Sequence, residues 1–202
     1  MGSQITLTEL SPPVFRGSID QLMGVYKAAM NPPERQLAGR ETIMERHAAN
    51  PDFRALAAVD PGSGGGIAGF CYGFHGLPGQ WWHDIVAAAL ASIERAHGDG
   101  DGMAWLADSF EVAELHVMPQ WQGRGIGRAL LLELASSRPE RTAVLSTQDA
   151  ESRAKRLYRS VGFTDLITGF RFSGGDVAYA VMGAVLPLGS RSVPRSASPS
   201  AW

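Results

Sequence analysis

The chain has 202 residues, and its 18 basic and 20 acidic side chains give a formal net charge of −2. This length predicts one domain with a substantial hydrophobic core. Acidic and basic residues are mixed along the chain, which argues against the basic surface of a nucleic-acid-binding protein. Cys71 is the single cysteine, which excludes an internal disulfide and a cysteine-based metal cluster, so we expect no metal.

Hydropathy predicts a protein without a membrane partner. No stretch reaches the roughly 18 apolar residues of a membrane span, and the N-terminus has no charged region leading into an apolar one. We therefore expect a cytoplasmic protein. Residues 1–188 are expected to form its one domain. Residues 189–202 are rich in Ser, Pro and Arg and lack a hydrophobic pattern, which predicts a disordered tail.

The N-terminal half reads as a strand, two helices and two further strands. Apolar periodicity and turn residues predict strands over residues 5–10, 53–59 and 66–74 and helices over residues 18–30 and 40–49. Ser18 or Asp20 is expected to cap the first helix, and Pro32 and Pro33 end it.

A helix over residues 81–97 is predicted next, followed by the glycine-rich loop 98–102. Trp81 and Trp82 at its start have two interpretations. They could wall an acceptor pocket, or they could anchor the helix to the domain. Anchoring is the commoner role of such aromatics, and we favour it.

The most informative motif is QGRGIG, residues 122–127, between a predicted strand over 110–118 and a helix. Glycines let backbone N–H groups close on an anion, and the N-terminus of the following helix points its positive dipole end at the same place. Ile126, Leu130, Leu131 and Leu134 form an apolar stripe, so the helix begins inside the glycine run. This favours a phosphate site over a flexible turn.

Two known glycine patterns fail on this loop. The dinucleotide pattern G-x-G-x-x-G would need a third glycine at Leu130 or Arg128, and the triphosphate pattern needs a Lys-Ser or Lys-Thr pair that is missing.

A second motif lies downstream. Residues 142–147 predict a strand, and Asp149 is expected to cap a helix with Ala154, Leu157, Tyr158 and Val161 on one face, ended by Gly162. Residues 164–172 and 177–186 predict a closing strand pair.

The loop matches the pattern Q-x-x-G-x-G, and the segment AKRLYRSVGF matches the pattern A-x-x-L-Y-x-x-x-G-F. With these two motifs the chain resembles the GNAT superfamily of acyl-CoA-dependent N-acyltransferases. The resemblance covers roughly residues 5–188 and is specific over residues 111–163. It implies an α/β (α+β) domain of three layers. Its mixed, mostly antiparallel sheet of about seven strands is splayed in the middle, with helices on both faces.

The resemblance also implies the coenzyme contacts. The glycine loop would hold the pyrophosphate of coenzyme A, and backbone groups near residues 115–117 would bind the pantetheine and polarise the thioester carbonyl. The implied cofactor-binding residues are Leu115, His116, Val117, Gln122, Gly123, Arg124, Gly125, Ile126, Gly127 and Arg128. Glu151 stands where the family often has Asn, so a coenzyme contact there is not expected.

Tyr158 has two interpretations, an ordinary aromatic on the inner helix face or the group that protonates the departing thiolate. Helical spacing alone favours the core role, and the resemblance favours the proton donor, since a phenol of pKa about 10 can serve a thiolate.

Amine acylation also requires a base, because an ammonium of pKa about 10 has no lone pair at neutral pH. We rank Glu111 first, Glu114 second and His116 third. A regular strand would point Glu111, Ala113, Leu115 and Val117 one way and Glu114 and His116 the other. The family usually has a bulge in this strand, which would change that parity.

The resemblance thus implies transfer of acetyl from the co-substrate acetyl-CoA to a primary amine by direct attack in a ternary complex. The acceptor is a small molecule or a peptide, and a homodimer stays open. The competing interpretations are a non-catalytic acyl-CoA-binding module on the same scaffold and a site for a different phosphate ligand.

Overall fold

The computed structural model describes residues 5–34, 37, 39–97 and 102–189. The first half of the chain contains β1 (Thr6–Glu9), α1 (Pro12–Gly17), α2 (Ile19–Met30), α3 (Arg40–His47), β2 (Arg54–Asp60), β3 (Gly66–Gly76) and α4 (Trp81–His97). The second half contains β4 (Ser109–Val117), α5 (Ile126–Leu134), β5 (Thr142–Gln148), α6 (Arg153–Ser160), β6 (Thr164–Phe170) and β7 (Tyr179–Val185). Single turns of 3-10 helix lie at Pro61–Ser63, Gly102–Trp105 and Pro119–Trp121.

The strands form one sheet in the order β1-β2-β3-β4-β5-β7-β6. Neighbouring strands are antiparallel except for β4 and β5, which run parallel. The parallel pair requires a crossover, and α5 supplies it. The predicted mixed, mostly antiparallel sheet of seven strands is therefore confirmed.

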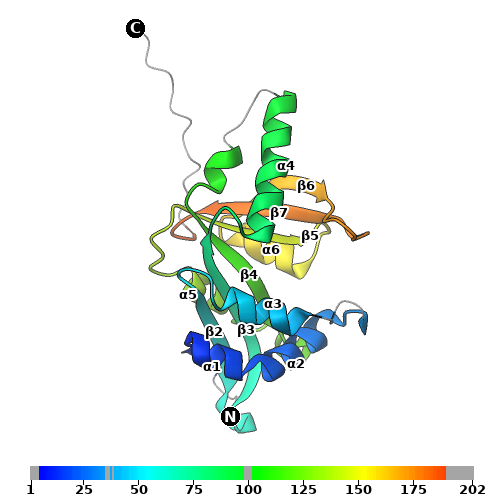
Figure 1. Ribbon diagram of the computed structural model, residues 1–202. Coiled ribbons are helices and arrows are strands. Elements are labelled where there is room, and N and C mark those ends of the chain that lie inside the picture. The colour runs from blue at the N-terminus through cyan, green and yellow to red at the C-terminus, as the bar shows by residue number, and fades with distance from the viewer. Residues whose placement is uncertain (1–4, 35–36, 38, 98–101, 190–202) are drawn as a thin grey trace.

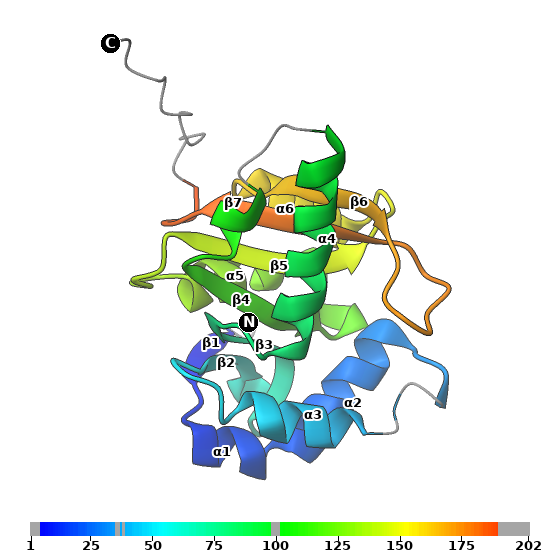
Figure 2. The same ribbon diagram turned by 45° about the horizontal axis from the view of Figure 1, so that its top comes forward.

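Helices cover both faces of this sheet, as Figures 1 and 2 show. On one face, α5 and α6 bury a core that contains Leu130, Leu134 and Tyr158. On the other face, α1, α2 and α3 cover the half of the sheet formed by β1 to β4. The helix α4 covers the remaining half, where Val86 and Leu90 pack against Val144 and Val181 of β5 and β7. The predicted three-layer arrangement is also confirmed.

The sheet opens in its middle, between β4 and β5. These two strands are paired only over Ser109, Phe110 and Glu111, whereas β4 is paired with β3 along its whole length. Beyond Glu111, β4 is no longer paired with β5. We call this opening the splay, and Glu111 lies at its vertex.

A bulge in β4 changes which way its side chains point. Tyr72 of β3 is opposite Glu114, but the next residue of β3 is opposite Val112, so Ala113 is the extra residue. Phe110 and Val112 pack toward α5, and after the bulge Leu115 and Val117 do so. β4 therefore has the bulge that the resemblance implies, and the side-chain parity of a regular strand does not hold beyond it.

Some local predictions were wrong. The helix α1 was missed, because a turn and a half is too short for periodicity to be recognised, although Pro12 stands at its start and Phe15 is fully buried. Asp149 does not cap α6. Ser152 is the N-cap, and its hydroxyl accepts from the Lys155 N–H at 3.1 Å. Of the predicted tail, residues 190–202 lie outside the described residues, as do residues 98–101 of the predicted loop.

Candidate active site

The glycine loop has the backbone geometry that its sequence predicts. Gly123 and Gly125 have φ of 76° and 81°, in the left-handed region that favours glycine, and Gly125 is the N-cap of α5. A Cβ placed on either residue would meet no atom within 4 Å, so the loop faces open space. The N–H groups of the first turn of α5 have no partner within the helix. Such a helix start attracts anions.

The loop is tied to the strand before it and to the helix α6. Gln122 Nε2 donates to the Val117 carbonyl at 3.0 Å, which fixes the loop at the end of β4. The Arg124 guanidinium lies 4.8 Å from the centre of the Trp121 ring. Arg128 Nη1 donates to Ser160 Oγ at 3.0 Å. Arg128 therefore links α5 to α6, a contact that the sequence did not suggest.

The predicted pantetheine-binding residues Leu115, His116 and Val117 lie on β4 beyond the vertex of the splay. Opposite them on β3 are Cys71, Phe70 and Gly69, so their pairing uses the edge away from β5. Because the ladder to β5 ends at Glu111, the other edge of this stretch is directed into the splay. Backbone groups there can bind an extended ligand arm as an added strand would.

Tyr158 lies in the middle of α6 and is 7% exposed. It packs in the core between α6 and the sheet, with the Phe163 ring centre 5.8 Å away. Burial raises the pKa of its phenol, and the negative charge of Glu114 raises it further. The hydroxyl is therefore protonated across the physiological pH range, as a proton donor must be.

Glu111 is buried at the vertex of the splay and is 5% exposed. Its Oε2 atom has no hydrogen-bond partner among the described residues. Loss of solvation alone raises its pKa to about 8. On β5 its neighbour in register is Val144, which packs toward α4. Glu111 is therefore a desolvated carboxyl with a pKa near neutrality.

Glu114 lies on the same face of β4 as Glu111 but has charged neighbours. Arg40 Nη2 of α3 is 2.8 Å from Glu114 Oε1, and His116 Nε2 contacts Oε2. Burial acts to raise the pKa of Glu114, but the hydrogen bond from His116 and the charges of His116, Arg40 and His47 outweigh it, so the pKa is lowered. Glu114 is therefore ionised and already paired.

Aromatic side chains enclose this pair. Tyr26 of α2 lies under the Arg40 guanidinium, 4.3 Å from its carbon to the ring centre, and meets the His116 ring edge-on at 5.1 Å. His47 Nδ1 is 3.1 Å from the Tyr72 hydroxyl. His116, our third candidate base, is thus held between Glu114 and two packed rings, those of Tyr26 and Phe70.

Sequence reasoning did not find Tyr26, Arg40 or Lys155. Tyr26 and Arg40 meet Glu114 only through tertiary contacts, so no local pattern marks them. Lys155 stands inside the tyrosine motif, where sequence reasoning assigned it no role. It is 4% exposed, and its Nζ lies 2.5 Å from Asp149 Oδ1 and 3.4 Å from Asp165 Oδ1, which ties α6 to β5 and β6.

Comparison with known proteins agrees with this architecture. A model of the acetyltransferase (GNAT) domain matches residues 80–165. The chain is 34% identical to the GCN5-like protein acetyltransferase Rv2170 of Mycobacterium tuberculosis, over 91% of this chain and 99% of that protein. The chain belongs to the GNAT acetyltransferase family. This makes it an acyltransferase rather than a non-catalytic module on the same scaffold.

Solved GNAT structures share the fold at low sequence identity. The ribosomal-protein-S18-alanine N-acetyltransferase of Escherichia coli superposes with a TM-score of 0.61 and 15% identity, over 94% of this chain and 99% of that chain. Arabidopsis thaliana NAA60, solved in complex with acetyl-CoA, gives 0.58 and 17%, over 91% and 99%. None of the helices in the described part of this GNAT chain has the length and apolarity needed to cross a membrane.

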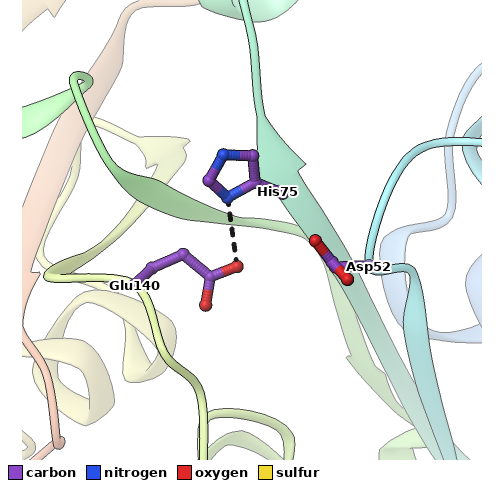
Figure 3. Close-up of side chains that lie close together, drawn as sticks. All are labelled: Asp52, His75 and Glu140. Atoms are coloured by element: carbon purple, nitrogen blue, oxygen red, sulfur yellow. Dashed lines mark hydrogen bonds and ion pairs between the residues drawn. The ribbon is translucent and has the colours of Figure 1, made fainter.

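A second group of polar side chains, drawn in Figure 3, lies on the paired side of Glu111, where His75 is opposite Phe110. Asp52, His75 and Glu140 bring potential metal-ligand atoms within 4.8 Å of one another. The Glu140 carboxylate, however, is paired with Arg138, whose Nε donates to Oε2 at 2.9 Å and whose Nη2 contacts Oε1. The guanidinium already balances the buried charge, and His75 is near the opposite end of β3 from the residues that flank the glycine loop. The contacts of Glu140 with Arg138 and His75 therefore account for the burial of its carboxylate.

Proposed function

We propose that this GNAT enzyme transfers the acetyl group of acetyl-CoA to a primary amine of a polypeptide, by direct attack of the amine on the thioester. The observation that carries the proposal is the placement of Glu111. A buried carboxyl with a pKa of about 8 lies at the vertex of the splay, and the anion-binding glycine loop lies at the end of the same strand. The choice of a polypeptide rests on the name of the Mycobacterium tuberculosis relative, a protein acetyltransferase.

The donor would lie along β4. The backbone of residues 123–128 and the start of α5 would bind the pyrophosphate, since both glycines leave the loop open and the helix dipole favours an anion. The free edge of β4 from Leu115 to Val117 would bind the pantetheine and direct the thioester toward the vertex. A backbone N–H of this edge can stabilise the oxyanion that forms on the carbonyl.

Glu111 would act as the general base. In its ionised form the carboxylate takes a proton from the acceptor ammonium, directly or through a water, and leaves a lone pair on nitrogen. A base is most effective when its pKa is close to the working pH, and about 8 satisfies this. Glu114 is less suited because it is paired with Arg40 and His116.

Tyr158 would act as the general acid. The nitrogen forms a bond to the thioester carbon, the carbonyl re-forms as the C–S bond of the tetrahedral intermediate breaks, and the phenol gives its proton to the departing thiolate. The nitrogen loses its second proton to solvent, and Glu111 releases to solvent the proton that it took from the ammonium. Burial keeps Tyr158 protonated. The phenolate is reprotonated from solvent after the products leave.

Acetyl-CoA binding to Gly125 variants tests the donor site. Gly125→Glu should weaken binding at least a hundredfold by calorimetry, because a carboxylate would repel the pyrophosphate. Gly125→Ala is the matched control, since it carries the same strain at φ 81° without the charge, and it should lose much less affinity. Equal affinities of Gly125→Glu and the wild type would refute the loop assignment.

Release of CoA with a panel of acceptors tests the reaction. The panel contains lysine peptides, peptides with only a free N-terminal amine, and small amines. Turnover on a peptide supports the proposal. Turnover on small amines alone would move the acceptor to that class, and acetyl-CoA binding without turnover on any amine would contradict the proposed reaction.

A further inference from the structure

The two tryptophans at the start of α4 have opposite surroundings. Trp82 packs against the core between α4 and the sheet, and its Nε1 donates to Ser146 Oγ of β5 at 3.1 Å. Trp81 is 63% exposed, yet its ring is stacked on Phe172, with centres 5.4 Å apart and planes at 29°. Trp82 therefore anchors the helix, and Trp81 is held in place with one face open to solvent.

The Trp81–Phe172 stack lies beside the end of β5 that borders the splay. Phe172 meets Tyr179 edge-on at 5.2 Å, and Tyr179 is the first residue of β7. Tyr179 is paired with Gln148, the last residue of β5, and β5 is paired with β4 only up to Val144. The neighbouring Trp82 is hydrogen-bonded to Ser146 in the same stretch of β5. The stack is thus connected through β7 and β5 to the open part of the splay.

The surroundings of the stack are mostly apolar. Leu77, in the turn before α4, is 37% exposed, and Val177, in the turn between β6 and β7, is 41% exposed. The turn of residues 171–178 carries one basic and one acidic side chain, and the Arg171 guanidinium donates to the Asp176 carbonyl. The Asp84 carboxylate accepts from the Gly79 N–H at 3.0 Å. An acceptor with several positive charges would need a cluster of free carboxylates to bind here, and these two segments do not offer one.

We propose that Trp81 and Phe172 form a docking surface for an apolar side chain, best an aromatic one, that neighbours the acetylated amine in the acceptor polypeptide. This inference rests on the proposed function and names the feature of the acceptor that the enzyme selects. A rigid aromatic face binds a second ring by stacking and loses little conformational entropy on binding. Single exposed apolar side chains are common on protein surfaces, whereas contiguous apolar patches mark interaction sites, and the rings of Trp81 and Phe172 are in contact with each other.

The experiment uses the full chain and two peptide series. One series has a single lysine and an acetylated N-terminus, and the other has a free N-terminus and no lysine. In each, the residue beside the amine is Phe, Leu, Ser, Asp or Arg. CoA release gives kcat/KM, and fluorescence anisotropy of labelled peptides in the presence of CoA gives binding without turnover.

In the wild type, Phe peptides should bind and react about tenfold better than Ser, Asp or Arg peptides in at least one series. Trp81→Ala should remove this preference, and Trp81→Phe should restore most of it. The affinity of Trp81→Ala for acetyl-CoA should equal that of the wild type, which excludes misfolding. Val14→Ala changes an exposed apolar residue of α1 and should leave the preference intact.

Three outcomes overturn the docking surface: a Phe preference that survives in Trp81→Ala, a wild-type preference for Asp or Arg, and peptides that neither bind nor react. If peptides fail while small amines are acetylated, the docking surface falls and acetyl transfer stands. If no amine reacts but Phe peptides bind through Trp81, the proposed reaction falls and the docking surface stands.

Discussion

The two carboxyl groups of β4 lie three residues apart on one face of the strand and have different partners. Glu111 is buried, its Oε2 atom has no hydrogen-bond partner in the described part of the chain, and its pKa is raised to about 8. Glu114 is partly buried, has Arg40 and His116 within contact distance, and has a lowered pKa.

This contrast shows that the environment, and not the residue type, assigns the chemical role. Burial without a partner keeps a carboxyl neutral until the pH approaches its raised pKa, so that it can exchange a proton near neutrality. Burial with partners fixes the charge and makes the group structural. The bulge at Ala113 is what brings both carboxyls to the same face. The comparison predicts different behaviour for the two residues in activity and in stability.

The largest effect is expected for Glu111→Gln. A glutamine of nearly the same shape cannot accept the proton, so kcat/KM for an amine acceptor should fall about a hundredfold or more, the usual worth of a general base. The rise of kcat/KM through pH about 8 should disappear as well, since kcat/KM reports the pKa of the free enzyme. A pH profile from 6 to 10 measures both.

The matched control for this variant is Glu45→Gln, which changes an exposed carboxyl on α3 and should leave the profile unchanged. A Glu111→Gln enzyme with most of its activity would remove Glu111 from the mechanism. If the rise of kcat/KM through pH about 8 were lost in Glu114→Gln instead, the roles assigned to the two residues would be reversed.

A smaller effect, on stability, is expected for Glu114→Gln. Removal of the charge leaves the Arg40 guanidinium, 27% exposed, without its ionic partner. Breaking a buried pair on one side costs about 3 kcal/mol of unfolding free energy. Urea unfolding at pH 7 measures the loss, and the double variant with Arg40→Met should lose less than the two single changes together. A loss below about 0.5 kcal/mol would show that the pair is only a surface contact.

Much of this architecture was predictable from the sequence, because it rests on local patterns. The glycine loop, the helix that begins within it and the helix of Tyr158 are each specified by periodicity and by residues that suit left-handed backbone. The family resemblance supplied the splayed sheet, which no local pattern specifies. The bulge in β4 also came from the resemblance, and its position at Ala113 depends on how β4 pairs with β3.

The surroundings of the two carboxyls could not be predicted, because they depend on contacts between distant segments. Arg40 and Glu114 are far apart in the sequence, and the same is true of Trp81 and Phe172. The sequence ranked Glu111 above Glu114 by position in a motif and contained no information about their solvation. The adjacent tryptophans also look equivalent in the sequence, and only the fold separates an anchor from an exposed ring.

The pH dependence of stability gives the next and smaller contrast. The folded-state pKa of Glu111 is raised from its usual 4.5 to about 8, so folding becomes less favourable as the pH rises through this range. Glu111→Gln should therefore match the wild type at pH 4 and exceed its unfolding free energy at pH 9. For Glu114 the pKa is lowered, so its stabilisation is present above pH 4.5 and is lost on acidification. Denaturant midpoints of Glu111→Gln and Glu114→Gln at pH 4 and pH 9 test both predicted directions. If the stability of the two variants relative to the wild type changed with pH in the same way, the contrast between the two carboxyls would be contradicted.

The smallest effect is expected for Tyr158→Phe. Burial keeps the phenol protonated, so it can supply a proton to the sulfur while the base acts on the amine. Its loss should lower kcat about tenfold, less than general acid catalysis usually contributes, because a thiolate is already a fair leaving group. Affinity for acetyl-CoA should stay close to that of the wild type. Since the acid and the base act on different atoms in different steps, the pH limb near 8 should persist in Tyr158→Phe. Loss of that limb would mean that Tyr158 and Glu111 share one proton transfer, and an unchanged kcat would return Tyr158 to the hydrophobic core.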